Sequence, residues 1–342
     1  MQLSKDLSTI ILDHGSGGLL SQDLVTNIIV PRLGKRYLGK MEDSAVFKLK
    51  ESTIAMTTDS FVIDPIFFGN GNIGKISICG TVNDLAVSGA KPLYLTLAMV
   101  IEEGFPLSDL KKILEAITET AKEAGVYIVA GDTKVVRKGE VDKIFINTSG
   151  VGVFTQDSTK LTMSSVKEGD DIIVTGQIGN HSIHILSMRE GLGYEQKVLS
   201  DCAPLNKMID KVLKKHANNI HYMRDLTRGG LGSALNEIST AINKGIEIKL
   251  YEIPIQQETQ MAADMLGVNP IYLANEGTLV IFCSPDVAND VIAVLKADKY
   301  GKKSSVVGKV KRTKDNKVIS VNNEGEIKLI DHLYGQELPR LC

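Results

Sequence analysis

The sequence predicts a protein of two domains, each combining helices and strands. The chain has 342 residues, which is enough for about two domains. Short apolar runs with strand-like composition alternate with longer segments that repeat apolar side chains at helical spacing. A change in pattern near residues 155–168 marks a boundary between two halves. The hydrophobic fraction of 43% and the charged fraction of 23% are those of an ordinary globular protein.

The overall composition excludes several classes of function. The net charge is −2, so there is no basic surface to indicate a nucleic-acid partner. Four cysteines form no CxxC pair, which argues against a zinc site and favours a reducing compartment: Cys79, Cys202, Cys283 and Cys342. The N-terminus has no signal-peptide pattern, and no apolar run reaches the roughly 20 residues that span a bilayer. We therefore expect a cytoplasmic protein.

The first segment, residues 1–40, contains a glycine-rich loop at 14–18 and then a helical pattern that Pro31 ends. Backbone N–H groups at such a helix start can receive a phosphate, although a mobile arm is the better interpretation from the residues alone. Strands are expected at 45–49 and 53–58. Asp43 precedes the first strand and Asp59 follows the second.

The stretch 57–92 organises the rest of the chain. It holds three acids and a turn with three glycines: Asp59, Asp64, Asp84, Gly69, Gly71 and Gly74. Glycines let backbone N–H groups approach a phosphate, and carboxylates bind the Mg²⁺ that bridges to phosphate oxygens. An apolar stripe at helical spacing follows, flanked by Asn83 and Asp84. Each residue alone is more simply a turn, a cap or a solvated acid, but the whole set indicates a ligand site.

A strand at 93–101, a helix at 107–124 and strands at 126–130 and 144–154 complete the first half. The segment GDTK at 131–134 places Asp132 and Lys134 at the end of one strand. Strand ends of this kind often line ligand sites, although a solvated lysine is an equally good interpretation of Lys134.

The second half opens with a strand at 172–175 and a helix after it. Further on, a glycine-containing helix start follows Arg224 and Arg228. The two arginines could clamp an anion there, or could simply be surface arginines. Glu276 lies between a loop and the buried strand 278–282, where partial desolvation would suit a general base. A loop acid hydrogen-bonded to the backbone is an equally good interpretation. A helix and polar strands are expected over residues 286–330.

The chain ends in Cys342, a thiol on a short arm. Ten extended residues reach roughly 33 Å, far enough to visit an active site and another protein. The alternative is a terminal cysteine without a function.

Several of these segments resemble the PurM-like (AIR synthetase-related) superfamily, and within it the HypE family of hydrogenase maturation. The matching segments are HGSGG, TTDSFVIDPIFF, GNIGK, CGTVNDLAVSGAKPLYL, GDTKVV, ANEG and the terminal PRLC. One loop departs from the family, where the common IGDHG is altered by Asn180 and Ser182, and His184 replaces a small residue. We therefore do not include that loop among the predicted phosphate or metal sites.

The resemblance implies an α+β, PurM-like two-domain fold. After residues 1–40, an ATP-binding mixed α/β domain would span 41–155 and form a sheet or barrel with a second subunit of a homodimer. A C-terminal α/β domain would span 165–330. A flexible tail, 331–342, would end in Cys342.

The implied activity is ATP-dependent dehydration of a carbamoyl group carried on Cys342, from S-carboxamide to thiocyanate, which supplies cyanide to the [NiFe]-hydrogenase iron. The implied partners are a HypF-type carbamoyltransferase and a HypC–HypD complex that accepts the cyanide. The implied cofactors are ATP and Mg²⁺. By resemblance, the catalytic residues are Cys342, Glu276 and Lys134 beside it; the metal ligands are Asp43, Asp59 and Asp84; and the nucleotide site adds Asn83, Asp132 and Arg228.

Two other classes of function stay open. An ATP-dependent small-molecule kinase or ligase on the same fold would not need the tail. A non-catalytic carrier that offers Cys342 to partners would have no ATPase activity.

Overall fold

The computed structural model describes residues 18–29, 31, 45–49, 52–154, 160–312 and 315–333. Asp43, the loop residues 14–17 and Cys342 lie outside this part, so the roles predicted for them stay predictions. Within it, no helix combines the length and the apolar character needed to cross a membrane. The helices of four or more residues are α1 (Gly18–Asp23), the π-helix Leu24–Ile29, α3 (Ile73–Val87), α4 (Leu107–Ala124), α5 (Asn180–Glu190), α6 (Asn206–His216), α7 (Gly230–Ile242), α8 (Gln257–Leu266) and α9 (Ala288–Lys296).

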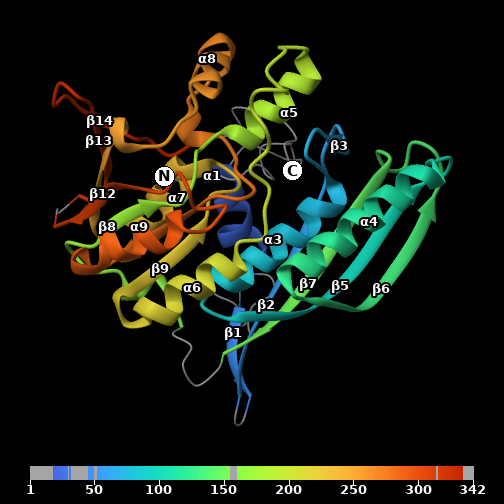
Figure 1. The fold of residues 1–342 in the computed structure, drawn as a ribbon, viewed down its shortest axis with the longest axis horizontal. Coiled ribbons are helices and arrows are strands. Elements are labelled where there is room, and N and C mark those ends of the chain that lie inside the picture. Colours follow the sequence, from blue (N-terminus) through green and yellow to red (C-terminus); the bar gives the residue numbers. More distant parts are fainter. Residues whose placement is uncertain are drawn as a thin grey trace.

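The N-terminal sheet is open and has five strands in the order β1-β2-β7-β5-β6. They are β1 (Ala45–Leu49), β2 (Ser52–Phe61), β5 (Lys91–Glu102), β6 (Tyr127–Val136) and β7 (Ile144–Val153), and only β5 and β6 pair parallel. α3 and α4 lie on one side of this sheet (Figure 1). β7 alternates buried and partly exposed residues, as expected for a sheet with one covered face. The α+β class is confirmed, but the chain by itself forms no closed barrel from these five strands.

The C-terminal sheet has seven strands in the order β14-β13-β10-β12-β8-β11-β9. They are β8 (Asp171–Val174), β9 (Ile220–Asp225), β10 (Gly245–Lys249), β11 (Leu279–Cys283), β12 (Ser305–Lys311), β13 (Val318–Val321) and β14 (Ile327–Leu329). Successive side chains of a strand point to opposite faces of the sheet, and different helices cover the two faces of this one. Ile172 of β8 packs in a core with α7, whereas Ile173 packs in a separate core with α6 and α9. Two short strands, β3 (Phe67–Phe68) and β4 (Gly71–Asn72), form a hairpin beside the N-terminal sheet.

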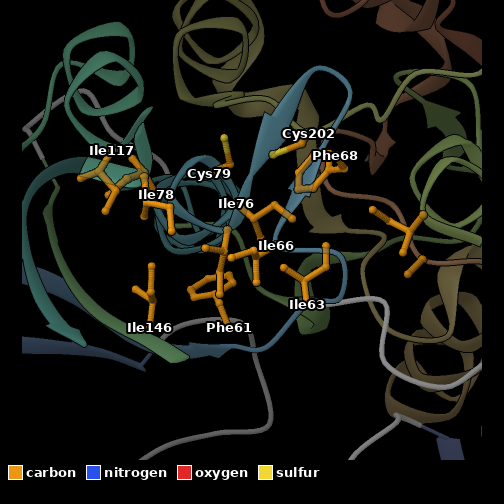
Figure 2. Close-up of a cluster of buried hydrophobic side chains, with 14 of the residues drawn as sticks. Phe61, Ile63, Ile66, Phe68, Ile76, Ile78, Cys79, Ile117, Ile146 and Cys202 are labelled. Atoms are coloured by element: carbon orange, nitrogen blue, oxygen red, sulfur yellow. The ribbon is translucent and has the colours of Figure 1, made fainter. Parts of the chain in front are cut away.

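Helix α3 is the centre of the molecule. The sequence predicts a single apolar stripe, but thirteen of its fifteen residues are buried, because it packs on β2 and β7 and also on α6 and β9 of the other half. One core cluster therefore contains residues of both domains, including Cys79 of α3 and Cys202 (Figure 2). The Asn72 side chain accepts hydrogen bonds from the backbone N–H groups of Gly74 and Lys75, which starts the helix.

Two predicted strand ends are wrong. β2 continues to Phe61, so Asp59 lies inside the strand rather than after it. β6 continues to Val136, so Asp132 and Lys134 also lie within a strand. The reason in the second case is tertiary, since β6 pairs with β5 along nearly its whole length. The helix predicted at 107–124 is confirmed as α4, and Gly125 ends it with φ 79°.

Candidate active site

Two of the predicted metal ligands lie together between β2 and α3. The Thr57 hydroxyl donates to the Asp84 carboxylate at 2.8 Å, and the Thr81 hydroxyl donates to the Asp59 carboxylate at 3.1 Å. Burial raises the pKa of Asp59 above its ordinary value. The hydrogen bond from Thr81, the positive charge of Arg228 and a hydrogen bond with Asp84 oppose this rise in pKa. Hydroxyl donors thus hold two carboxylates from different elements at one place.

Arg228, from the C-terminal domain, lies close enough to Asp59 for its positive charge to act on that acid. It stands just before α7, in a turn where Gly229 and Gly230 have φ of 74° and 58°. A Cβ at Gly230 would lie 2.6 Å from the Leu273 carbonyl oxygen, so this turn needs glycine for both conformation and space. The positive charge acts on Asp59 across the two domains. Arg224 is ion-paired with Glu237 at 2.6 Å, and the clamp of two arginines stays a prediction.

The acids fit the way in which proteins bind Mg²⁺. This ion keeps several waters and is usually bound by one or two carboxylates together with substrate phosphates. The described part of the chain has no cluster of three or more potential metal ligands, and Asp43, the third predicted ligand, lies outside it. Asp59 and Asp84 supply the carboxylates, and Arg228 supplies a cation for phosphate oxygens.

Glu276 lies in a loop that is fixed on both sides. Its backbone N–H donates to Asp201 at 3.0 Å, and the Gly277 N–H donates to the same carboxylate at 3.0 Å. The Thr278 hydroxyl adds a third hydrogen bond to Asp201 at 2.9 Å. Burial raises the pKa of Asp201, although these hydrogen bonds act in the opposite direction. A Cβ at Gly277 would meet the Asp201 carbonyl oxygen at 1.8 Å, so the loop can approach this closely only with glycine there.

The Glu276 residue is 4% exposed, and its charge contributes to the pKa of a neighbouring thiol. Burial raises the pKa of Cys202 well above its ordinary value, and a hydrogen bond with Cys79 and the negative charge of Glu276 raise it further. Both thiols belong to the core (Figure 2). The sequence contained no signal for the role of Asp201, because the residue lies 75 positions from the loop that it holds.

Lys134 and Asp132 lie elsewhere. They form an ion pair with each other at 3.2 Å, with side chains 69% and 62% exposed. Both belong to β6, which lies at an outer edge of the N-terminal sheet (Figure 1). The predicted arrangement with Lys134 beside Glu276 does not occur within the single chain, because the partner of Lys134 here is Asp132.

Asn83 connects the two domains. Its side-chain amide donates to the Ala203 carbonyl at 3.1 Å, and its oxygen accepts from the Leu205 N–H at 2.8 Å. Asn83 is 3% exposed. This position explains the residue structurally, and its role as a nucleotide ligand stays a prediction. Asp64, the third acid of the organising stretch, is ion-paired with Lys143 at 2.6 Å.

Comparisons with known proteins identify the family of this chain. Residues 41–154 and 167–321 match the models of the N-terminal and C-terminal domains of AIR synthase related proteins. A protein of Bradyrhizobium diazoefficiens named Carbamoyl dehydratase HypE is 38% identical over 97% of this chain and 95% of its own length. The chain belongs to the HypE family.

Solved structures of HypE proteins have the same fold. One, from a HypE–HypF complex, is 41% identical and superimposes with a TM-score of 0.85, covering 91% of this chain and 99% of its own. Another, in complex with ATP, is 36% identical with a TM-score of 0.81, covering 98% and 100%. The chain is accordingly a carbamoyl dehydratase of hydrogenase maturation.

Proposed function

We propose that the chain carries a carbamoyl group on the Cys342 thiol and dehydrates it to a thiocyanate at the expense of ATP. The observation that supports this most strongly is the convergence of Asp59 and Asp84 with Arg228 from the opposite domain. Such a site suits a triphosphate, because the acids can bind a phosphate-bridged Mg²⁺ and the arginine can pair with phosphate oxygens. One relative is described as a HypE in complex with ATP, which agrees with this assignment.

The reaction removes water from an amide in two steps. An amide oxygen leaves poorly, so it first takes the γ-phosphoryl group of ATP and ADP departs. The carbon–oxygen bond then breaks, the oxygen leaves as phosphate and the nitrogen loses two protons, which gives S–C≡N. Asp59 and Asp84 would hold Mg²⁺, with Asp43 as a third ligand, and this ion would neutralise phosphate charge.

Glu276 is the proposed acceptor of the protons from the amide nitrogen. Its loop is immobilised by Asp201, which provides the fixed geometry that proton transfer requires. Its burial keeps water from competing for the proton.

Lys134 is proposed to act only in a homodimer. β6 is almost entirely exposed, and Tyr127, Val129 and Val135 on it are 72%, 60% and 70% exposed. An apolar edge strand of this length is normally covered in a native protein. Pairing of two N-terminal sheets through β6 would cover these side chains and bring Lys134 and Asp132 into the interface.

The proposed partners follow from the reaction. A HypF-type carbamoyltransferase would load Cys342, as the HypE–HypF complex of a relative suggests. A HypC–HypD complex would accept the cyanide. These steps would take place in the cytoplasm.

The test is a mass measurement. The protein is incubated with its carbamoyltransferase, carbamoyl phosphate and ATP, and the intact mass and the C-terminal peptide mass are recorded. We expect a carbamoyl adduct on Cys342 that loses one water only with ATP, and no adduct on that peptide in Cys342→Ala. An unmodified tail with an active carbamoyltransferase would favour the small-molecule kinase instead.

A further inference from the structure

A pocket of about 390 Å³ lies in the C-terminal domain, at the beginning of β9. Its walls are formed by residues 160 and 164–167, before β8, and by residues 217, 218, 220 and 221, after α6. The opposite end of β9 leads to the turn with Arg228. Since a strand advances about 3.3 Å per residue, β9 alone separates the two ends by roughly 17 Å. This pocket is therefore distinct from the candidate active site.

His221 is the most unusual residue of the pocket. Its side chain is 5% exposed, and its Nδ1 lies 2.7 Å from the Asp170 carboxylate. The same carboxylate accepts a hydrogen bond from the Lys167 backbone N–H at 2.7 Å, so its position is fixed. The Nε2 of His221 is buried and has no hydrogen-bond partner among the described residues. An unsatisfied buried nitrogen is costly, so a water molecule or a ligand atom is expected to complete the arrangement.

The remaining polar groups of the pocket favour an anion. Lys160 and Lys167 line it, and hydroxyl and amide groups come from Ser164, Ser165 and Asn218. No acid is among the lining residues. The nearby Asp170 side chain is 3% exposed and its carboxylate is hydrogen-bonded by His221 and by the Lys167 N–H, so it does not line the opening.

We propose that this pocket binds the phosphate group of a small phosphate monoester. Lysine ammonium groups and serine hydroxyls are suitable donors for phosphate oxygens. The second ionisation of a phosphate monoester lies near pH 6, so its phosphate can either accept a proton or donate one. It therefore suits His221 Nε2 both when this nitrogen donates and when it accepts. The cavity volume is at the lower end of the range for small organic ligands, which leaves space for an organic group beside the phosphate.

The test is calorimetry on the full chain without divalent cations, so that the Mg²⁺-dependent nucleotide site does not contribute. Glycerol 3-phosphate and inorganic phosphate are titrated separately at constant ionic strength. We expect saturable binding of both, with the monoester tighter. Lys160→Gln/Lys167→Gln should raise the Kd about tenfold or more, since two charge-assisted contacts are lost. Lys328→Gln is the matched control, because Lys328 is an exposed residue of β14, at the other edge of the same sheet.

Imidazole ring spectra provide a second readout. Glycerol 3-phosphate should shift one ring signal of the six histidines, and His221→Gln identifies that signal. Mg·ATP affinity should be unchanged in Lys160→Gln/Lys167→Gln, which separates this proposal from the proposed function. The absence of saturable binding to the unmodified chain would overturn the proposal. So would a ring shift that persists when both lysines are replaced, and equal affinity for the two probes would overturn the assignment to a monoester.

Discussion

At the scale of single residues, the candidate site depends on carboxylates whose positions are set by neighbouring hydroxyls. The acids Asp59 and Asp84 were predicted from the sequence because acids, glycines and a helix start are close together there. The threonines that orient them and the distant Asp201 were not predicted. A hydroxyl or acid that acts by hydrogen bonding to a residue far along the chain has no local sequence pattern.

Asp84→Asn should weaken Mg·ATP binding by about tenfold or more, because it removes one anionic ligand while preserving the shape of the side chain. Calorimetry with Mg·ATP measures the effect. Asp315→Asn is the control, since this acid has a 70% exposed side chain in the C-terminal domain. An unchanged Kd for Asp84→Asn would remove this residue from the site.

Glu276→Gln should leave Mg·ATP binding within about twofold but stop the loss of water. The S-carboxamide on Cys342 would then accumulate, which intact mass spectrometry detects. Glu324→Gln provides an exposed control. If thiocyanate forms in Glu276→Gln at the normal rate, Glu276 is not the base.

At the scale of elements, the loop and helix starts that form the site are tightly packed. Gly230 illustrates this, since its positive φ and its closeness to the Leu273 carbonyl both position Arg228. The sequence predicted a helix start next to these glycines. The close contact with residue 273 is visible only in the folded chain.

Gly230→Ala should therefore destabilise the protein more than Gly267→Ala does. Both glycines have positive φ, so both variants carry the backbone strain of about 1 kcal/mol or more. A Cβ at Gly267 meets nothing within 4 Å, whereas one at Gly230 meets three backbone atoms below 3 Å. We expect the loss in free energy of unfolding to be at least about twice as large for Gly230→Ala. Urea unfolding tests this, and equal losses would mean that the local backbone relaxes without cost.

At the scale of the whole molecule, the two domains are held together by a shared core and by polar contacts. Glu123 of α4 accepts hydrogen bonds from Lys299 at 2.7 Å and from Tyr300 at 2.5 Å, both in the C-terminal domain. Burial alone would raise the pKa of Glu123, but the hydrogen bonds from Lys299 and Tyr300 outweigh it and lower the pKa below 4.5. The ionised form is thus favoured by folding.

The resulting stability should depend on pH in a defined direction. A carboxyl with a lowered folded-state pKa stabilises the fold above its unfolded pKa of about 4.5, and this contribution is lost as the pH falls through the folded pKa. Glu123→Gln should cost up to about 1 kcal/mol at neutral pH, because the pair is partly exposed. The difference from the unmodified chain should disappear at acidic pH in urea unfolding. Glu119 is an exposed acid on the same helix, so Glu119→Gln should show no such pH-dependent difference. If the stability difference between Glu123→Gln and the unmodified chain stays the same at every pH, the ionic explanation is refuted.

The sequence by itself determined the α+β class, the helix α4 and the family, because periodicity and contiguous motifs are local properties. Its motifs also predict Asp59, Asp84 and Arg228 as site residues, although they do not show that Arg228 acts on Asp59 from the other domain. Tertiary structure decided that α3 is buried on nearly all sides, that GDTK lies within an exposed edge strand and that Asn83 bridges the domains. It also decided that Asp201 fixes the Glu276 loop. Each of these depends on a surface supplied by residues distant in the chain, and such a surface exists only after the two domains have packed together.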